Sequence, residues 1–270
     1  MFGDLDLFSQ SEQPPAGKGI GILYIDTETT GADPSTAEIC EIGAVLVPYD
    51  GLTQLSMEIA EYHSLVKPSE DIPPEASAIH HITGDMVKAA PSAAEIESLI
   101  SPLVARASFV CAHNAPFDMA ILTRQMPGVF RRFEESNIVD SLRLARHLWP
   151  QIPSHSLQAL RYRFGLGKGL EGDAHRALFD AYLVMRLIHH ARDSSLLPVK
   201  SWDELSDFAR SPLEVTVFNF GKYRGSLVED VAVQDPQYVT WLLSQVWVPK
   251  DYPDLYHTLL RKLGSDRKGR

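Results

Sequence analysis

The chain has 270 residues, of which 44% are hydrophobic, and its formal net charge is −10 at neutral pH. A chain of this length folds as one large domain or as one domain with a small appendage, and the composition excludes a fibrous or wholly disordered protein. It contains neither an apolar run long enough to cross a bilayer nor a signal-peptide pattern at its start. We therefore expect a cytoplasmic protein with no membrane partner.

The charge and the cysteines restrict the kinds of partner and site. A net negative charge argues against nucleic-acid binding through excess Lys and Arg, although residues 261–270 contain five basic residues and one acid. We expect these ten residues to form a basic tail, which is either solvated or in nonspecific contact with phosphates. Cys40 and Cys111 each lie in an apolar run and are expected to be buried free thiols.

The first 200 residues predict a mixed sheet flanked by helices. Residues 1–18 are rich in Ser, Gln, Pro and Gly, which is typical of a flexible arm. Three strands joined by short turns follow at 20–25, 38–47 and about 55–66, and they predict an antiparallel meander. Helix and strand then alternate, with helices predicted at 74–79, 83–88, 92–105, 117–125, 141–148, 156–164 and 174–192 and a strand at 108–112.

The pattern changes after residue 193. Residues 194–212 are expected to be a linker that contains a short helix, because Ser201 and Glu204 form a capping box. Residues 213–260 predict a small α+β module with a strand at 214–220 and helices at 228–232 and 236–243. A module of about fifty residues has little core of its own, so it is expected to dock on the first domain or on a partner.

The first chemical signal is a pair of acids at the end of the first strand. Asp26 and Glu28 follow an apolar run and stand two positions apart, so both carboxylates project from the same face of the strand. The alternative is a solvent-exposed strand end, but four apolar residues in a row indicate a central strand, where unpaired anions are costly. The pair therefore predicts a metal site.

Two further groups of polar residues stand at the starts of predicted helices later in the chain. Asp118 lies in the first turn of the helix after the strand at 108–112, where an acid also interacts favourably with the helix dipole. His175 and Asp180 lie at the start of the helix predicted to run to residue 192. Their spacing does not place them on one helical face, so we expect His175 on the preceding loop, approaching a site that Asp180 lines.

Together these residues resemble the three motifs of the DEDDh family of 3′→5′ exonucleases, which includes proofreading exonucleases. Residues 25–31 (Ile-Asp-Thr-Glu-Thr-Thr-Gly) match the first motif, residues 113–118 (His-Asn-Ala-Pro-Phe-Asp) the second, and residues 175–180 (His-Arg-Ala-Leu-Phe-Asp) the third. The resemblance covers roughly residues 20–192, predicts an exonuclease domain at 19–193 and implies a ribonuclease H-like fold. A sister subfamily has Tyr where this chain has Arg176, so His175 indicates the histidine branch.

The resemblance implies a catalytic site of four acids and one histidine. Asp26, Glu28, Asp118 and Asp180 would hold two divalent cations roughly 4 Å apart, and His175 would accept the proton of the attacking water. Oxygen ligands favour Mg²⁺ or Mn²⁺ over Zn²⁺.

Contacts with the substrate follow from the same resemblance. Thr29 and Thr30 would lie beside the 3′-terminal nucleotide, and Asn114 belongs to the same predicted set. Phe117 and His80 are the candidates for stacking on the terminal base. The alternatives are that Phe117 is a core residue and that His80 is a surface loop residue.

Two segments outside the exonuclease motifs predict further contacts. Residues 218–242 resemble a small module attached to exodeoxyribonuclease X-like proteins, in which Lys222, Tyr223 and Arg224 would bind a nucleic-acid strand. The alternative is a structural turn with solvated charges. The arm resembles the peptide with which bacterial replication proteins dock on the sliding clamp, with Leu5, Leu7 and Phe8 as anchors and Asp4 in place of Gln. These anchors could instead pack on their own domain.

The combined prediction is a metal-dependent 3′→5′ exonuclease that acts on single-stranded DNA ends in repair or proofreading and releases nucleoside 5′-monophosphates. The alternatives are an exoribonuclease that trims RNA 3′ ends, or a non-catalytic module that binds nucleic acid or a polymerase. A sliding clamp, a polymerase and a second copy of the chain are the predicted protein partners.

Overall fold

The computed structural model describes residues 20–49, 52, 59–170, 172 and 174–266. The predicted arm, with Leu5, Leu7 and Phe8, lies outside the described residues, as do residues 267–270 of the predicted tail. Among the described residues, helices with the length and apolar character required to cross a membrane are absent.

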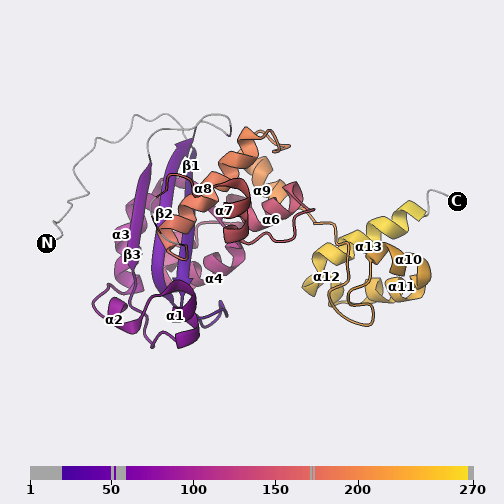
Figure 1. The fold of residues 1–270 in the computed structure, drawn as a ribbon, viewed down its shortest axis with the longest axis horizontal. Coiled ribbons are helices and arrows are strands. Elements are labelled where there is room, and N and C mark those ends of the chain that lie inside the picture. The colour runs from indigo at the N-terminus through magenta and orange to yellow at the C-terminus, as the bar shows by residue number, and fades with distance from the viewer. Residues whose placement is uncertain (1–19, 50–51, 53–58, 171, 173, 267–270) are drawn as a thin grey trace.

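The centre of the first domain is a five-stranded mixed sheet with strand order β3-β2-β1-β4-β5 (Figure 1). β1 pairs with β2 and β2 with β3 in antiparallel fashion, whereas β4 is parallel to β1 and to β5. The predicted mixed sheet with an antiparallel meander is therefore confirmed, with β1 as its central strand. The strands are β1 (Ile20–Thr29), β2 (Ile39–Tyr49), β3 (Ala60–Leu65), β4 (Ala107–Ala112) and β5 (Ile138–Asp140).

Helices cover both faces of this sheet. Because side chains alternate along a strand, Ile22 and Tyr24 of β1 join the core beneath α8, whereas Leu23 and Ile25 join the core on the side of α3 and α4. The helices are α1 (Pro74–His80), α2 (Gly84–Val87), α3 (Ala93–Ala105), α4 (Ala115–Gln125), α5 (Pro127–Phe130), α6 (Ser141–Leu148), α7 (Leu157–Phe164), α8 (Ala177–Asp193) and α9 (Trp202–Arg210), with a 3-10 turn at Glu135–Asn137.

Helix α8 lies directly on β2 because Gly43 has no side chain. A Cβ atom at Gly43 would stand 2.1 Å from the backbone nitrogen of Leu178 and 2.2 Å from the carbonyl carbon of Ala177. The first turn of α8 therefore approaches the sheet as closely as two backbones allow, which fixes the height of His175 and Asp180 above it.

Helix α9 begins as predicted but belongs to the core of the first domain. The Ser201 hydroxyl accepts a hydrogen bond from Glu204 N–H and caps the helix. Trp202 is 1% exposed and packs on Phe109 with ring centroids 6.0 Å apart, while the Ser206 hydroxyl donates to the carbonyl of Ile138 at 2.9 Å. The predicted linker at 194–212 is therefore corrected, since its helix is part of the packed first domain.

The C-terminal module is helical rather than α+β. Its core contains Phe218, Val231, Leu242 and Leu259. The prediction of a strand at 214–220 is wrong, because within the described part of the module the only pairing is an isolated bridge between Val217 and Leu227. The helices are α10 (Val228–Gln234), α11 (Pro236–Ser244), α12 (Val248–Asp251) and α13 (Pro253–Asp266).

The boundary of the predicted basic tail also changes. Helix α13 extends to Asp266, so Arg261 and Lys262 are helical residues and each lies 3.8 Å from the Glu214 carboxylate. Both basic side chains thus face an acid of their own module.

Polar contacts connect the module to the first domain. Arg143 of α6 donates two hydrogen bonds of 2.9 Å to the Asp254 carboxylate of α13. The same guanidinium donates to the carbonyls of Ala209 and Ser211, and Leu213 N–H donates to Asp254. One arginine therefore holds the end of α9, the connecting segment and the module together.

Candidate active site

The end of the central strand places two carboxylates under the first turn of α8. Asp26 and Glu28 alternate in phase with Tyr24, whose side chain lies in the core beneath α8, so both acids face that helix. Burial raises the pKa of Asp26 well above its ordinary value, and the charges of Asp118 and Asp180 raise it further. Burial and the charge of Asp180 raise the pKa of Glu28 to about 8.

The next two groups are His175, which precedes α8, and Asp180, which lies in the first turn of that helix. His175 has a left-handed backbone with φ of 59°, and its N–H donates to Asp180 Oδ2 at 3.3 Å. Asp180 is 5% exposed and also accepts a hydrogen bond of 2.9 Å from Gln158 Nε2. Ligand atoms of Glu28, His175 and Asp180 all lie within 4.8 Å of one another. The loop position predicted for His175 is confirmed.

Asp118 reaches the same strand end from the other side of the sheet. It lies in the first turn of α4, and its Oδ1 accepts hydrogen bonds from Thr27 N–H at 3.1 Å and from the Thr27 hydroxyl at 2.7 Å. Burial raises the pKa of Asp118 to about 7, even though these hydrogen bonds favour the charged form. Asp118 is therefore held by the residue between Asp26 and Glu28.

The electrostatics of these residues suit a metal ion. Burial raises the pKa of Asp180 as well, so all four acids hold their protons more tightly than free side chains do. A divalent cation would relieve both the burial of negative charge and the mutual repulsion. Glu28, His175 and Asp180 form a group that could hold such an ion, and Asp26 and Asp118 interact electrostatically with one another beside it.

Asp140, which sequence reasoning did not identify, supports the second motif. Its Oδ1 accepts hydrogen bonds from Asn114 N–H at 3.0 Å and from Leu142 N–H at 2.9 Å. Asp140 therefore caps α6. It also fixes Asn114, whose φ is 74°, at the N-terminus of α4. The signal available in the sequence is an acid followed by Ser141 directly after the apolar pair at 138–139.

The predicted substrate contacts occupy different environments. Thr30 N–H donates to the Glu38 carbonyl at 2.8 Å, and the Thr29 hydroxyl donates to the Gly31 carbonyl at 2.9 Å, so both threonines order the strand end. Asn114 is exposed, whereas Phe117 is half-buried and packs on the core beside α4. Thr29 and Phe117 are the chain neighbours of Glu28 and Asp118, respectively.

The prediction that the His80 ring stacks on a base requires correction. His80 is 2% exposed at the end of α1. Its Nε2 lies 3.3 Å from the Thr29 carbonyl and 3.7 Å from Cys40 Sγ, and its Nδ1 accepts from Ile82 N–H. A buried ring offers no face to a base, and the contact of His80 with this part of the chain is with the Thr29 carbonyl. Cys40 and Cys111 are buried free thiols, as predicted.

The predicted strand-binding residues of the C-terminal module surround one acid. Asp235 Oδ2 accepts from Lys222 Nζ at 2.9 Å and from the Tyr223 hydroxyl at 2.7 Å. The Tyr223 ring also lies 5.0 Å from that of Tyr238, centroid to centroid. Arg224 is exposed. Lys222 and Tyr223 thus order the turn over the start of α11, and Arg224 faces solvent.

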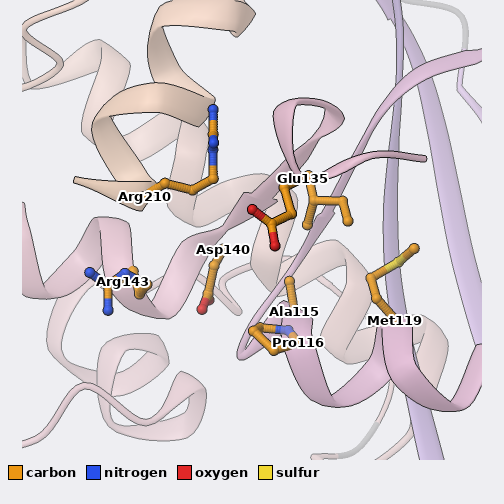
Figure 2. A pocket seen from close by; sticks show the side chains of 8 residues that line it. Ala115, Pro116, Met119, Glu135, Asp140, Arg143 and Arg210 are labelled. Carbon is orange, nitrogen blue, oxygen red and sulfur yellow. The ribbon is translucent and has the colours of Figure 1, made fainter. Parts of the chain in front are cut away.

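A cavity of about 470 Å³ lies beside the N-terminal end of α4 (Figure 2). Met119 and Ile138 contribute apolar surface, and Arg143 and Arg210 contribute positive charge. Asp140 is also in its lining. Asp140 in this lining accepts the hydrogen bond from Asn114 N–H, but the lining does not include the acids of the cluster.

Known proteins combine these features in the same order. A sequence model of the exonuclease family matches residues 23–188, and one of the exodeoxyribonuclease X-like C-terminal region matches residues 218–246. Exodeoxyribonuclease 10 of Escherichia coli (strain K12) is 34% identical over 230 residues, covering 83% of this chain and 91% of that protein. DNA polymerase III subunit epsilon of Treponema pallidum (strain Nichols) is 35% identical over 182 residues, covering 65% of this chain and 80% of that protein.

Solved structures agree with the sequence matches. Exonuclease X in complex with 5′ overhanging duplex DNA superposes with a TM-score of 0.53 at 31% identity, covering 70% of this chain and 99% of that chain. The predicted fold class is thereby confirmed as the ribonuclease H-like exonuclease fold. Because the family model covers more than half of the chain and the relatives match over most of their length, the chain belongs to the exonuclease family and carries an exodeoxyribonuclease X-like C-terminal region.

Proposed function

We propose that this protein is a metal-dependent 3′→5′ exonuclease that hydrolyses the terminal phosphodiester of single-stranded DNA and releases nucleoside 5′-monophosphates in DNA repair or proofreading. The observation that carries the proposal is the convergence of Glu28, His175 and Asp180 within 4.8 Å, beside Asp26 and Asp118. Relatives named as an exodeoxyribonuclease and as a polymerase III epsilon subunit favour DNA over RNA.

Each side chain has a distinct part in this proposal. Asp26, Glu28, Asp118 and Asp180 would hold Mg²⁺ or Mn²⁺, because hard divalent cations prefer carboxylate oxygens. The bound ions would supply charge stabilisation at the phosphoryl oxygens and a more acidic water. His175 is half-buried beside Asp180 and would accept the proton from that water. Thr29, Thr30, Asn114 and Phe117 would border the terminal nucleotide.

The direct test is digestion of DNA and RNA strands labelled at the 3′ or the 5′ end, with Mg²⁺ or Mn²⁺. We expect stepwise loss of nucleotides from the 3′ end of DNA, and a loss of at least about 100-fold in rate for Asp26→Asn. Asp85→Asn is the matched control, since Asp85 is exposed on α2. Full activity of Asp26→Asn, cleavage that does not depend on a 3′ end, or a preference for RNA would contradict the proposal.

A further inference from the structure

A fully buried carboxylate lies next to the four acids of the cluster. Glu41 of β2 is the register partner of Glu28 on β1, and it is 0% exposed. A charge in such a place is costly unless hydrogen-bond donors surround it. Its position is compatible with a further metal ligand, but its hydrogen bonds indicate a different role.

Donors from two parts of the protein, β3 and the start of α8, surround the Glu41 carboxylate. Arg176 donates to Oε1 from Nε at 2.9 Å and from its terminal nitrogen at 2.6 Å. His63 Nε2 lies 2.7 Å from the same oxygen, and Ala177 N–H donates to Oε2 at 2.9 Å. These donors occupy both oxygens, so Glu41 is engaged by the protein rather than directed at a cation.

Two of these donors immediately follow His175 in the chain. Arg176 has an extended backbone, and Ala177 is the first residue of α8. His175 itself has the left-handed φ of 59°, which is unfavourable for a residue with a Cβ atom and persists only where the surroundings impose it. Asp180 accepts a hydrogen bond from the His175 N–H. Glu41 accepts hydrogen bonds from the Arg176 side chain and from the Ala177 N–H.

We propose that Glu41 is a positioning residue of the exonuclease site, which, through Arg176 and Ala177, fixes the backbone from which the His175 ring approaches Glu28 and Asp180. The inference rests on the proposed function of His175 as proton acceptor. Glu41 touches neither substrate nor metal in this role. Its hydrogen bonds reach the two residues that follow His175. A displacement of the catalytic group by about 1 Å is enough to cost roughly 100-fold in rate.

A double-mutant cycle tests this role. The substrate is the p-nitrophenyl ester of thymidine 5′-monophosphate, whose hydrolysis reports on chemistry without a strand. We expect Glu41→Gln to lower kcat about 10- to 100-fold with little change in KM, because the lost contacts position the catalytic group. In a His175→Ala background, the same change should lower kcat by less than about twofold, because residues that act as a unit are not additive.

The arginine side of the contact provides a second cycle that does not alter the buried carboxylate. The Arg176 side chain is 39% exposed, so Arg176→Ala is expected to fold even if Glu41→Gln does not. Arg176→Lys keeps a positive charge and one donor nitrogen, and it should recover part of the kcat lost in Arg176→Ala. Arg192→Ala, at the far end of α8 and paired with Asp193, is the matched control and should leave kcat unchanged.

The outcomes separate the two proposals. If the wild-type protein hydrolyses neither the ester nor DNA, the exonuclease function itself fails. If the wild type is active and Glu41→Gln or Arg176→Ala lowers kcat by the same factor with and without His175, the positioning role is overturned. Unchanged kcat in both single variants would overturn it equally.

Discussion

At the residue scale, the carboxylates of the active site oppose folding when no cation is bound. The pKa of Glu28 is raised to about 8 from an ordinary value of 4.5, so the folded protein keeps a proton that the unfolded chain has released. Between these values the folded state binds more protons, and the free energy of unfolding therefore falls as pH rises. The acids that serve catalysis thus reduce stability at neutral and higher pH.

This repulsion predicts a pH-dependent stability difference between wild type and Glu28→Gln. In the presence of a chelator, the Tm of the wild type should fall relative to that of Glu28→Gln between about pH 7 and about pH 8.5, by roughly 2–4 °C for each kcal/mol of repulsion. The window avoids the buried His113 and His189, whose pKa values are lowered to about 4. Thermal unfolding at several pH values measures the difference, and parallel Tm curves would refute it.

Added Mg²⁺ provides the internal control for this experiment. A cation that binds the folded state alone raises Tm by mass action. Wild type should gain more than Glu28→Gln, since the variant offers one carboxylate fewer. Equal gains would show that Glu28 does not contribute to holding the ion.

Asp140 is predicted to affect catalysis without contacting the acidic cluster. Asp140→Ala removes the cap of α6 and leaves Asn114 N–H without its acceptor, so we expect a loss of about 1–2 kcal/mol in the free energy of unfolding. The rate of DNA digestion should fall as well, because the hydrogen bond of the Asn114 N–H orients the N-terminus of α4, the helix that bears Asp118. Asp140→Asn retains an acceptor and should preserve most of both properties. Urea denaturation and digestion rates of the wild type, Asp140→Ala and Asp140→Asn measure both effects. Equal stability and equal rates for the three proteins would contradict the prediction.

At the element scale, the contact between α8 and β2 depends on the missing side chain of Gly43. Gly43→Ala places a methyl group 2.1 Å from the Leu178 backbone nitrogen, and backbone atoms cannot move aside as a flexible side chain can. We expect a destabilisation of at least about 1–3 kcal/mol and loss of activity, because α8 carries Asp180. Gly84→Ala is the matched control, since a Cβ atom there meets no atom within 4 Å. Similar Tm values for both variants would rule out the close approach.

The elements also show how far the sequence predicts this site. Asp26, Glu28, Asp118, His175 and Asp180 could be predicted because each stands where a periodic segment begins or ends and because together they resemble the three exonuclease motifs. Glu41 could not, because its main partner Arg176 is 135 residues away in the chain. β5 has three residues, which is too short for a periodic pattern. In the module, residues 214–220 resemble a strand in sequence, but Val215, Phe218 and Phe220 pack in the core of the helical module.

At the scale of the whole molecule, Arg143 is predicted to control how firmly the C-terminal module is held. Its hydrogen bonds to Asp254, Ala209 and Ser211 involve a charged group, and bonds of this kind contribute about 1.5–3 kcal/mol each when broken on one side. Arg143→Ala should therefore speed proteolysis of residues 211–213, while hydrolysis of the small thymidine ester stays within about twofold of wild type.

Limited proteolysis followed by mass spectrometry measures this effect. Arg192→Ala, which breaks an ion pair away from the junction, is the comparison protein. The same cleavage rate in Arg143→Ala and in wild type would show that other contacts hold the module.

The separate core of the module has a consequence for how such a protein evolves. Among the described residues, Phe218, Val231, Leu242 and Leu259 pack only with their own module, and the buried residues of the sheet domain belong to other clusters. A gene fusion or truncation near the connection changes a few polar contacts and leaves both interiors intact. The two parts can then accumulate substitutions independently, so a lineage can exchange or lose the module while keeping the same nuclease.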